Sequence, residues 1–242
     1  MKFTSFCDKG GRPSNDDYYA VANKSGMQCF AVADGLGTNG GAASSLAVQT
    51  IIDEFKQHPE LSSAALNHYI TQAQSAILES KAYTPEYDSI GTTIAVLITN
   101  GKQAVYASCG DTRIYTFRHS SISEVTEDHS EAFDKFETNH ISYSEIRIDT
   151  DRHKLHRVLG DRLSWEPDIS DVININSAFS FLICTDGFWN LITEDEMEKA
   201  KRFAFSSSTW LKRMLNKVQS RIQNGSDNIT AAAICIEKSD VL

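Results

Sequence analysis

The stretch FAVADGLGTNGGAASSLAV, residues 30–48, begins with the pattern of a strand and ends with the pattern of a helix. Asp34 and Gly35 stand where the two patterns meet. Asp-Gly between two strand-like runs would indicate a hairpin, but residues 36–41 are rich in glycine, and Leu46, Ile51 and the apolar residues after them have helical spacing. The sequence therefore predicts a strand, a glycine-rich loop and a helix, with a carboxylate at the end of the strand.

The composition is that of a water-soluble globular protein. The chain has 242 residues, of which 41% are hydrophobic and 23% charged, so it can bury a sizeable core. No composition break or repeat divides it, and we expect one domain over residues 1–242. No run approaches the roughly 18 apolar residues of a membrane span, and the start, MKFTSFCDKGG, lacks the core of a signal peptide. We expect a cytoplasmic protein, with export by a route that leaves no N-terminal signature still open.

The net charge and the cysteines limit the kinds of partner that the chain could bind. The net charge is −9, which argues against a nucleic-acid-binding surface and is typical of a soluble protein. The five cysteines show no close pair and no zinc spacing, and most lie in or beside apolar runs, so they are expected to be reduced and buried. We expect no nucleic-acid and no membrane partner, and a monomer.

The pattern of elements favours antiparallel sheets with helices outside, not a parallel α/β fold. A hairpin is predicted at Asn100-Gly101, the dipeptide favoured in type I′ turns. Thr193 with Glu196, and Ser142 with Glu145, have capping-box spacing ahead of helices. Strand-like runs are found at residues 28–33, 92–99, 103–109, 113–117, 179–185 and 229–237, and helical spacing at 41–57, 61–80 and 210–222.

Four aspartates stand at the ends of these strand-like runs: Asp34, Asp111 and Asp186 after a run, and Asp227 just before one. Each alone fits a turn. In an antiparallel sheet, however, the end of one strand and the start of its neighbour share an edge, so the four could converge. Clustered carboxylates repel one another unless a cation lies between them, and oxygen-only ligands select magnesium, manganese or calcium over zinc. The glycine after Asp34 would let its carbonyl approach such an ion.

The segment GGRPSNDDYYA brings Arg12 close to Asn15, Asp16 and Asp17. This grouping could be an ion pair, but a guanidinium is also well suited to grip a phosphate oxyanion. Carboxylate-bound metals together with an arginine indicate phosphoryl chemistry.

The motifs, taken in order, resemble the PPM family, the metal-dependent protein serine/threonine phosphatases also called type 2C. RPSNDD is similar to the family's Arg-x-x-Asn-(Glu/Gln)-Asp, AVADGLG to its Asp-Gly motif and SIGTTIAVLI to its Gly-Thr-Thr strand. ASCGDTRIY resembles Val-Gly-Asp-Ser-Arg-x-Tyr, and LICTDGFWN resembles Ser-Asp-Gly-Leu-Trp-Asp. TEDHS and HKLHRVLGD look like the markers around the flap, placed here at about residues 127–157, and GSDNIT like the closing Asp-Asn-x-Thr strand.

The resemblance implies an α+β fold, a four-layer α-β-β-α sandwich of two antiparallel sheets flanked by helices. It implies two Mn²⁺ or Mg²⁺ ions, with Asp34 bridging them, the Gly35 carbonyl joining one and Asp186 and Asp227 binding the other. It gives Asp111, with Asp186, a third and weaker metal. By the same resemblance, Arg12 binds the phosphate, Asp16 and Asp17 support the metals and their waters, and Asn228 has a supporting role.

The implied activity is hydrolysis of phosphoserine and phosphothreonine in proteins by a metal-activated hydroxide, opposite a serine/threonine kinase. Two departures bear on it: Asp16 replaces the family's more common Glu, and Leu36 stands where many eukaryotic members have a histidine that could act as general acid. A two-metal phosphodiesterase and a non-catalytic phosphoprotein-binding module remain alternatives.

The polar 127–157 segment carries His129, His140, His153 and His156, whose spacing matches no zinc site and favours a solvated flap.

Overall fold

The computed structural model describes residues 1–237, so that residues 238–242 of the predicted domain lie outside the described residues. The strands are β1 (Lys2–Asp8), β2 (Asp17–Lys24), β3 (Met27–Leu36), β4 (Gly91–Thr92), β5 (Ile94–Thr99), β6 (Gln103–Cys109), β7 (Arg113–Arg118), β8 (Ser121–Val125), β9 (Asp168–Ile169), β10 (Ile173–Asn174), β11 (Phe179–Cys184) and β12 (Ile229–Cys235). The α-helices are α1 (Gly40–Gln57), α2 (Ser63–Tyr83), α3 (Glu131–Glu137), α4 (Asp186–Trp189), α5 (Glu194–Arg202) and α6 (Ser207–Gln219), and the 3₁₀ helices are η1 (Pro85–Tyr87) and η2 (Tyr143–Ile148).

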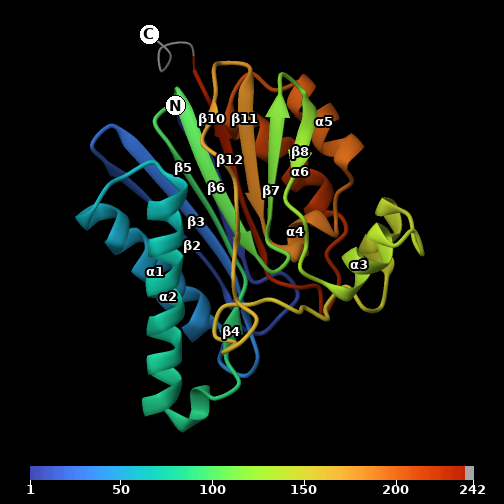
Figure 1. Cartoon of the computed structure of the whole chain (residues 1–242). Helices are drawn as coiled ribbons and strands as arrows, with labels where there is room; N and C mark the ends of the chain where they lie inside the picture. Colours follow the sequence, from blue (N-terminus) through green and yellow to red (C-terminus); the bar gives the residue numbers. More distant parts are fainter. Residues whose placement is uncertain (238–242) are drawn as a thin grey trace.

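Two antiparallel sheets lie face to face between two layers of helices (Figure 1). One sheet has the order β1-β12-β11-β7-β8, and the other has β10-β6-β5-β3-β2 with β4 paired to β3 and β9 to β6. Helices α1 and α2 cover the outer face of the second sheet, whereas α5 and α6 cover the first (Figure 1). The predicted α-β-β-α sandwich of two antiparallel sheets is confirmed.

The alternation of side chains along β3 builds two of the apolar layers. Cys29 and Ala31 face the helices α1 and α2, while Phe30 and Val32 point between the sheets. The same alternation in β12 sends Ala232 into the core between the sheets. Because side chains on successive residues point to opposite faces, Asp34 continues the row of Phe30 and Val32 and meets the end of the core between the sheets.

The hairpin predicted at Asn100-Gly101 is confirmed, because β5 and β6 pair with Ile98 opposite Val105. Its turn is not type I′, since Gly101 has a positive φ (84°) but Asn100 does not; instead the Asn100 side chain accepts hydrogen bonds from the backbone of the following residues. Positive φ at both central residues occurs at Ser25 and Gly26, which connect β2 to β3. That turn lacks the Asn-Gly and Asp-Gly signals.

Helix caps follow the expected side-chain chemistry. Thr193 caps α5 through a full capping box with Glu196. The Ser142 box is also formed, but it opens the short 3₁₀ helix η2, not an α-helix.

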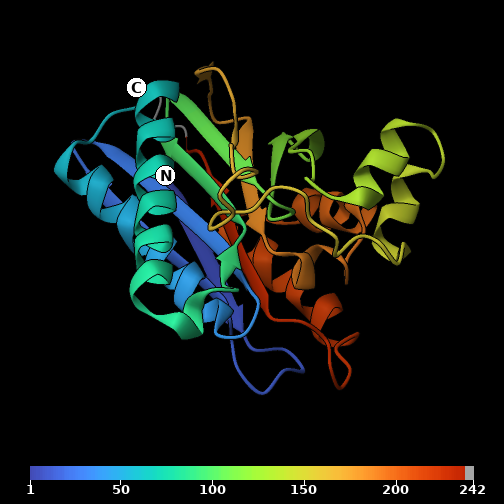
Figure 2. The same cartoon turned by 60° about the horizontal axis from the view of Figure 1, so that its bottom comes forward.

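The 127–157 segment projects beside the sandwich (Figure 2) and has a small apolar cluster of its own around Phe133 and Ile146. Over the described residues, no helix has the length and apolarity needed to cross a bilayer.

Candidate active site

The carboxylates predicted from strand ends meet at one edge of the sandwich. Asp34 stands near the end of β3, and Asp17, the first residue of β2, is its direct partner across the ladder. Asp111 lies in the β6–β7 turn, and Asp186 is the first residue of α4. Asp227 precedes β12.

A cavity of about 340 Å³ opens at this edge. Its lining includes Arg12, Asp16, Asp34, Gly35, Asp111, Asp186, Asp227 and Asn228. Every site residue predicted from the sequence therefore lines it except Asp17, which is buried beneath. The convergence expected for Asp34, Asp111, Asp186 and Asp227 is present in the fold.

Threonine hydroxyls separate these acids from the apolar core between the sheets. Thr185 donates a hydrogen bond to Asp17 Oδ2 (2.9 Å). Thr93 Oγ1 accepts from the Asp34 backbone N–H (3.0 Å) and shares a 2.6 Å hydrogen bond with Thr112. These hydroxyls satisfy polar groups that burial would otherwise leave unpaired.

Glycine is required at position 35 by the approach of two backbones. A Cβ there would lie 2.2 Å from the carbonyl oxygen of Gly40, which opens α1. The Gly35 N–H donates to the Asp16 carbonyl (3.1 Å), and the Asp16 side chain accepts from the N–H of Gly41 (3.2 Å). Asp16 therefore holds the start of α1, where a negative charge is favourable.

Arg12 and Asn228 organise the N-terminal loop. Arg12 Nη2 donates to Asp227 Oδ2 at 2.9 Å, and both side chains remain partly exposed. The buried Asn228 carboxamide accepts from the Asp16 N–H (2.7 Å) and donates to the carbonyls of Lys9 (2.9 Å) and Ser14 (2.8 Å). Asn228 thus fixes the loop that carries Arg12.

The acids repel one another and are poorly solvated. Burial, then the charge of Asp17 and the other aspartates, raises the pKa of Asp34 well above its usual value. Burial raises the pKa of Asp17 to about 7 and that of Asp186 to about 6. Burial, then Asp186, raises the pKa of Asp111.

The donor set fits hard divalent cations. Asp17 Oδ1 and Asp186 Oδ1 are buried without a hydrogen-bond partner, although buried carboxylate oxygens are normally paired. Within residues 1–237, no three acidic, imidazole or thiol groups already form a coordinating cluster. A cation would draw the mutually repelling oxygens together, and oxygen-only ligands suit magnesium and manganese.

His153 reaches the cavity, which the sequence did not predict. Its Nδ1 lies 3.7 Å from Asp186 Oδ2, and its ring lines the cavity wall. His129 also differs from the expectation of a solvated segment: it is 3% exposed, its Nδ1 accepts from the Gly110 N–H (3.1 Å), and its Nε2 donates to Asp168 (2.9 Å). The sequence feature that could have indicated these positions was the concentration of histidines in residues 127–157; their spacing gave no indication.

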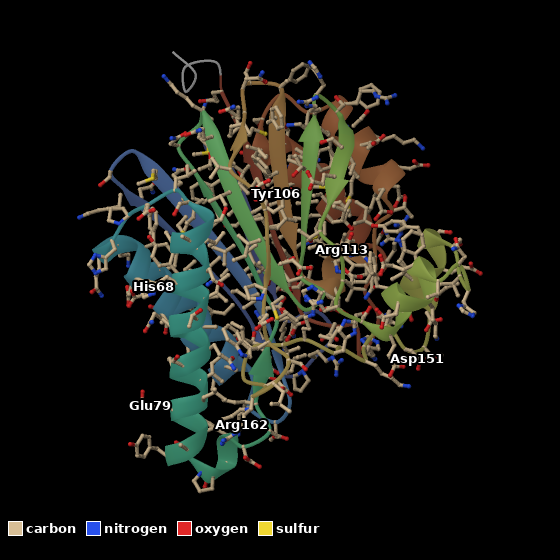
Figure 3. All side chains as sticks on the ribbon, in the orientation of Figure 1. His68, Glu79, Tyr106, Arg113, Asp151 and Arg162 are labelled. Carbon is tan, nitrogen blue, oxygen red and sulfur yellow. The ribbon has the colours of Figure 1, made fainter. Side chains whose placement is uncertain are left out.

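A buried cation links the 127–157 segment to the site. The Arg113 guanidinium, labelled in Figure 3, pairs with Asp128 (2.6 Å) and stacks 3.6 Å from the centre of the Trp189 ring. Trp189 Nε1 donates to the Asp111 carbonyl at 2.9 Å. Arg147, from η2, donates to the Trp189 carbonyl. The position of Asp111 therefore depends on contacts with the neighbouring segment.

Comparison with known proteins identifies the family. The sequence model of protein phosphatase 2C matches residues 7–226. The chain belongs to the protein phosphatase 2C family. It is 29% identical to the serine/threonine phosphatase Stp of Listeria welshimeri over 92% of this chain and 90% of that protein.

Two solved structures agree with the fold. The PPM Ser-Thr phosphatase MsPP from Mycobacterium smegmatis, in complex with cacodylate, has a TM-score of 0.82 and 26% identity over 98% of this chain and 99% of that one. The catalytic domain of the serine/threonine protein phosphatase PstP, in complex with 2 manganese ions, has a TM-score of 0.82 and 20% identity over 97% of both chains.

Proposed function

We propose that this member of the protein phosphatase 2C family hydrolyses phosphoserine and phosphothreonine esters of proteins in a metal-dependent reaction. The observation that carries the proposal is the cavity lined by Arg12 and five aspartates, in which burial and then mutual repulsion raise the pKa values of Asp34, Asp111 and Asp186. The Listeria and Mycobacterium relatives, named as serine/threonine phosphatases, support the same reaction.

The carboxylates would hold two Mn²⁺ or Mg²⁺ ions. Asp34 would bridge them with help from the Gly35 carbonyl, while Asp186 and Asp227 would bind the second ion. Asp111 would hold a third, weaker ion together with Asp186. Bound divalent ions lower the pKa of a water between them, which supplies the nucleophile for attack on phosphorus near neutral pH.

The remaining steps belong to the chain itself. Arg12, half exposed at the mouth of the cavity, would bind the non-bridging phosphate oxygens and hold the ester in line for attack. Asp16, on the cavity wall, would accept hydrogen bonds from water there, and Asp17, buried beneath, would support the metals. Leu36 lines the same cavity, and its side chain cannot act as a general acid. The leaving serine alkoxide must therefore be protonated by another group.

We propose further that the protein acts in the cytoplasm as a monomer, opposite a serine/threonine kinase, with the 127–157 segment as its flap. The five cysteines are free, as expected in a reducing compartment. The net charge of −9 weighs against a phosphodiesterase acting on nucleic acid, and retention of every predicted aspartate weighs against a binding module without activity.

The test is release of phosphate from phosphoserine and phosphothreonine peptides by the purified chain with manganese, with and without chelator. Asp34→Asn should lower turnover by at least ~10²–10³-fold, the loss typical of removing a transition-state-stabilising group. Asp53→Asn, on the exposed face of α1, is the matched control. Retention of a tenth of wild-type turnover by Asp34→Asn, or turnover only on phosphodiesters, would refute the proposal.

A further inference from the structure

A second cavity adjoins the candidate active site. It has a volume of about 240 Å³ and shares Arg12, His153, Asp186 and Asp227 with the first. Residues found only in the second include Arg152, Asn190 and Leu191. A substrate whose phosphate occupies the first cavity can therefore place a neighbouring side chain in the second.

Arg152 forms no close ion pair among residues 1–237, although its charge opposes the rise in the pKa of Asp186. Its Nε is buried with no hydrogen-bond partner, and its Nη1 makes only a long contact (3.4 Å) with the Asp149 carbonyl. Across residues 1–237, no carboxylate oxygen lies within the 4.0 Å of an ion pair with this guanidinium. The Arg152 side chain lines the second cavity with few hydrogen bonds of its own, so it can donate charge-assisted hydrogen bonds to an anion that enters there.

The acids nearest to Arg152 in the sequence are already engaged. Lys135 Nζ lies 2.8 Å from Asp149 Oδ1 and 2.6 Å from Asp151 Oδ2. Lys154 Nζ lies 2.9 Å from the other Asp151 oxygen. These pairs engage the acids next to Arg152, so that the nearby acid on which its charge acts is Asp186 of the candidate site.

The wall of the second cavity carries Arg152 and Arg12, which offset the carboxylates of Asp186 and Asp227 on the same wall. Burial, then the charge of Arg152, lowers the pKa of His153, while Asp227 raises it and Arg12 lowers it, and all four residues line this cavity. Asn190 Oδ1 is buried without a partner, while its Nδ2 donates to Asp186 (3.2 Å).

We propose that Arg152 forms a subsite for a second anionic group of the phosphoprotein substrate, a carboxylate or a second phosphate one or two residues from the phosphoserine. The inference rests on the proposed phosphatase function and names its preferred substrate class. In an extended peptide, side chains two residues apart lie on the same face at roughly 7 Å, a spacing suited to adjoining cavities. The chain as a whole is negative (−9) and would repel acidic substrates, so the preference must come from this local cation.

The experiment measures kcat/KM of the manganese-loaded enzyme on matched phosphoserine peptides. One position at a time, from two residues before to two residues after the phosphoserine, carries alanine, aspartate or a second phosphoserine. At the favoured position, the anionic peptides should be better substrates than the alanine peptide by about 10-fold, which is typical of one charge-assisted hydrogen bond. The aspartate and phosphoserine arms show whether a carboxylate suffices or a phosphate is needed.

Arg152→Gln should abolish that advantage; because its charge also acts on Asp186, the readout is the ratio of kcat/KM between anionic and alanine peptides, with an aryl phosphate reporting any change common to all substrates. Arg162→Gln is the matched control, because it removes an exposed arginine that lines neither cavity and lies away from Asp151 in Figure 3. Equal rates on all three peptides, or an advantage that survives in Arg152→Gln, would overturn the subsite. An equal fall in both arginine variants would indicate a general charge effect and overturn it too. Absence of turnover on every peptide, in contrast, would count against the proposed function itself.

Discussion

Replacing Asp186 by asparagine should stabilise the metal-free protein near neutral pH while removing its activity. In the folded chain, burial and the neighbouring Asp227 raise the pKa of Asp186 from 3.8 to about 6. Folding therefore favours the protonated carboxyl, and ionisation opposes folding. Asparagine has nearly the same shape, carries no charge and can still accept the Asn190 hydrogen bond of 3.2 Å.

The magnitude follows from linkage between protonation and folding. Below about pH 4 the carboxyl is protonated whether the chain is folded or unfolded, so wild type and variant should be equally stable. As the pH rises from about 4 to 6 the unfolded chain loses its proton first, and wild-type stability falls. At about 1.4 kcal/mol per pH unit, the difference reaches about 3 kcal/mol by pH 7.5, or about 6–12 °C in Tm for a chain of this size.

The assay is thermal unfolding of chelator-treated protein between pH 4 and pH 8, repeated with manganese. Manganese should raise the Tm of wild type more than that of Asp186→Asn. Asp128→Asn is the control of opposite sign, because it leaves the buried Arg113 without its 2.6 Å partner and should lower Tm at all these pH values. A lower Tm for metal-free Asp186→Asn at pH 7.5 would show that this carboxylate is a structural acceptor, and the reasoning would fail.

Three further outcomes are expected. Arg12→Ala should lower kcat/KM on phosphopeptides mainly through KM, by ~2–4 kcal/mol for a lost phosphate contact, and an unchanged KM with an altered manganese titration would make Arg12 a partner of Asp227 only. Asp111→Ala should retain two tight metals and slow phosphopeptides more than aryl phosphates, whose leaving groups need no protonation, and equal losses on both would exclude that role. Trp189→Phe removes the hydrogen bond to the Asp111 carbonyl, so it should weaken the third metal in a manganese titration while the Tm falls by only a few degrees, and an unchanged titration would contradict the coupling.

Much of the fold could be predicted because strand and helix periods are visible in single segments. The apolar alternation around Phe30 and the helical spacing after Gly40 each indicate their element without reference to the rest of the chain. The first two strands, β1 and β2, escaped this reading. Their side chains are only partly buried and their apolar pattern is weak, so that pairing with β12 and β3 decides their conformation.

The residues of the site also differ in whether the sequence could predict them. The aspartates at strand ends could be predicted, since antiparallel order alone brings them to one edge. His153 and Arg152 could not, because they lie in an irregular stretch after the short helices α3 and η2, whose path depends on ion pairs such as Lys135 with Asp149. Ion pairs between side chains that are far apart in the sequence leave no periodic pattern from which they could be predicted.

The pairing of Asp17 with Asp34 shows why activity and stability are opposed in this fold. Two carboxylates directly opposite on an antiparallel ladder destabilise the pair, and both have raised pKa values here. Thr185 donates a hydrogen bond to the Asp17 carboxylate, but an amide oxygen at that position would accept the same hydrogen bond, so this contact does not require the charge. Two opposed carboxylates at one sheet edge destabilise the fold without a structural gain. Their presence is explained if the charges bind a ligand, here the proposed metal ions. The metal-free protein should therefore gain stability from asparagine at position 17 or 34, and the active protein should lose its reaction by the same change.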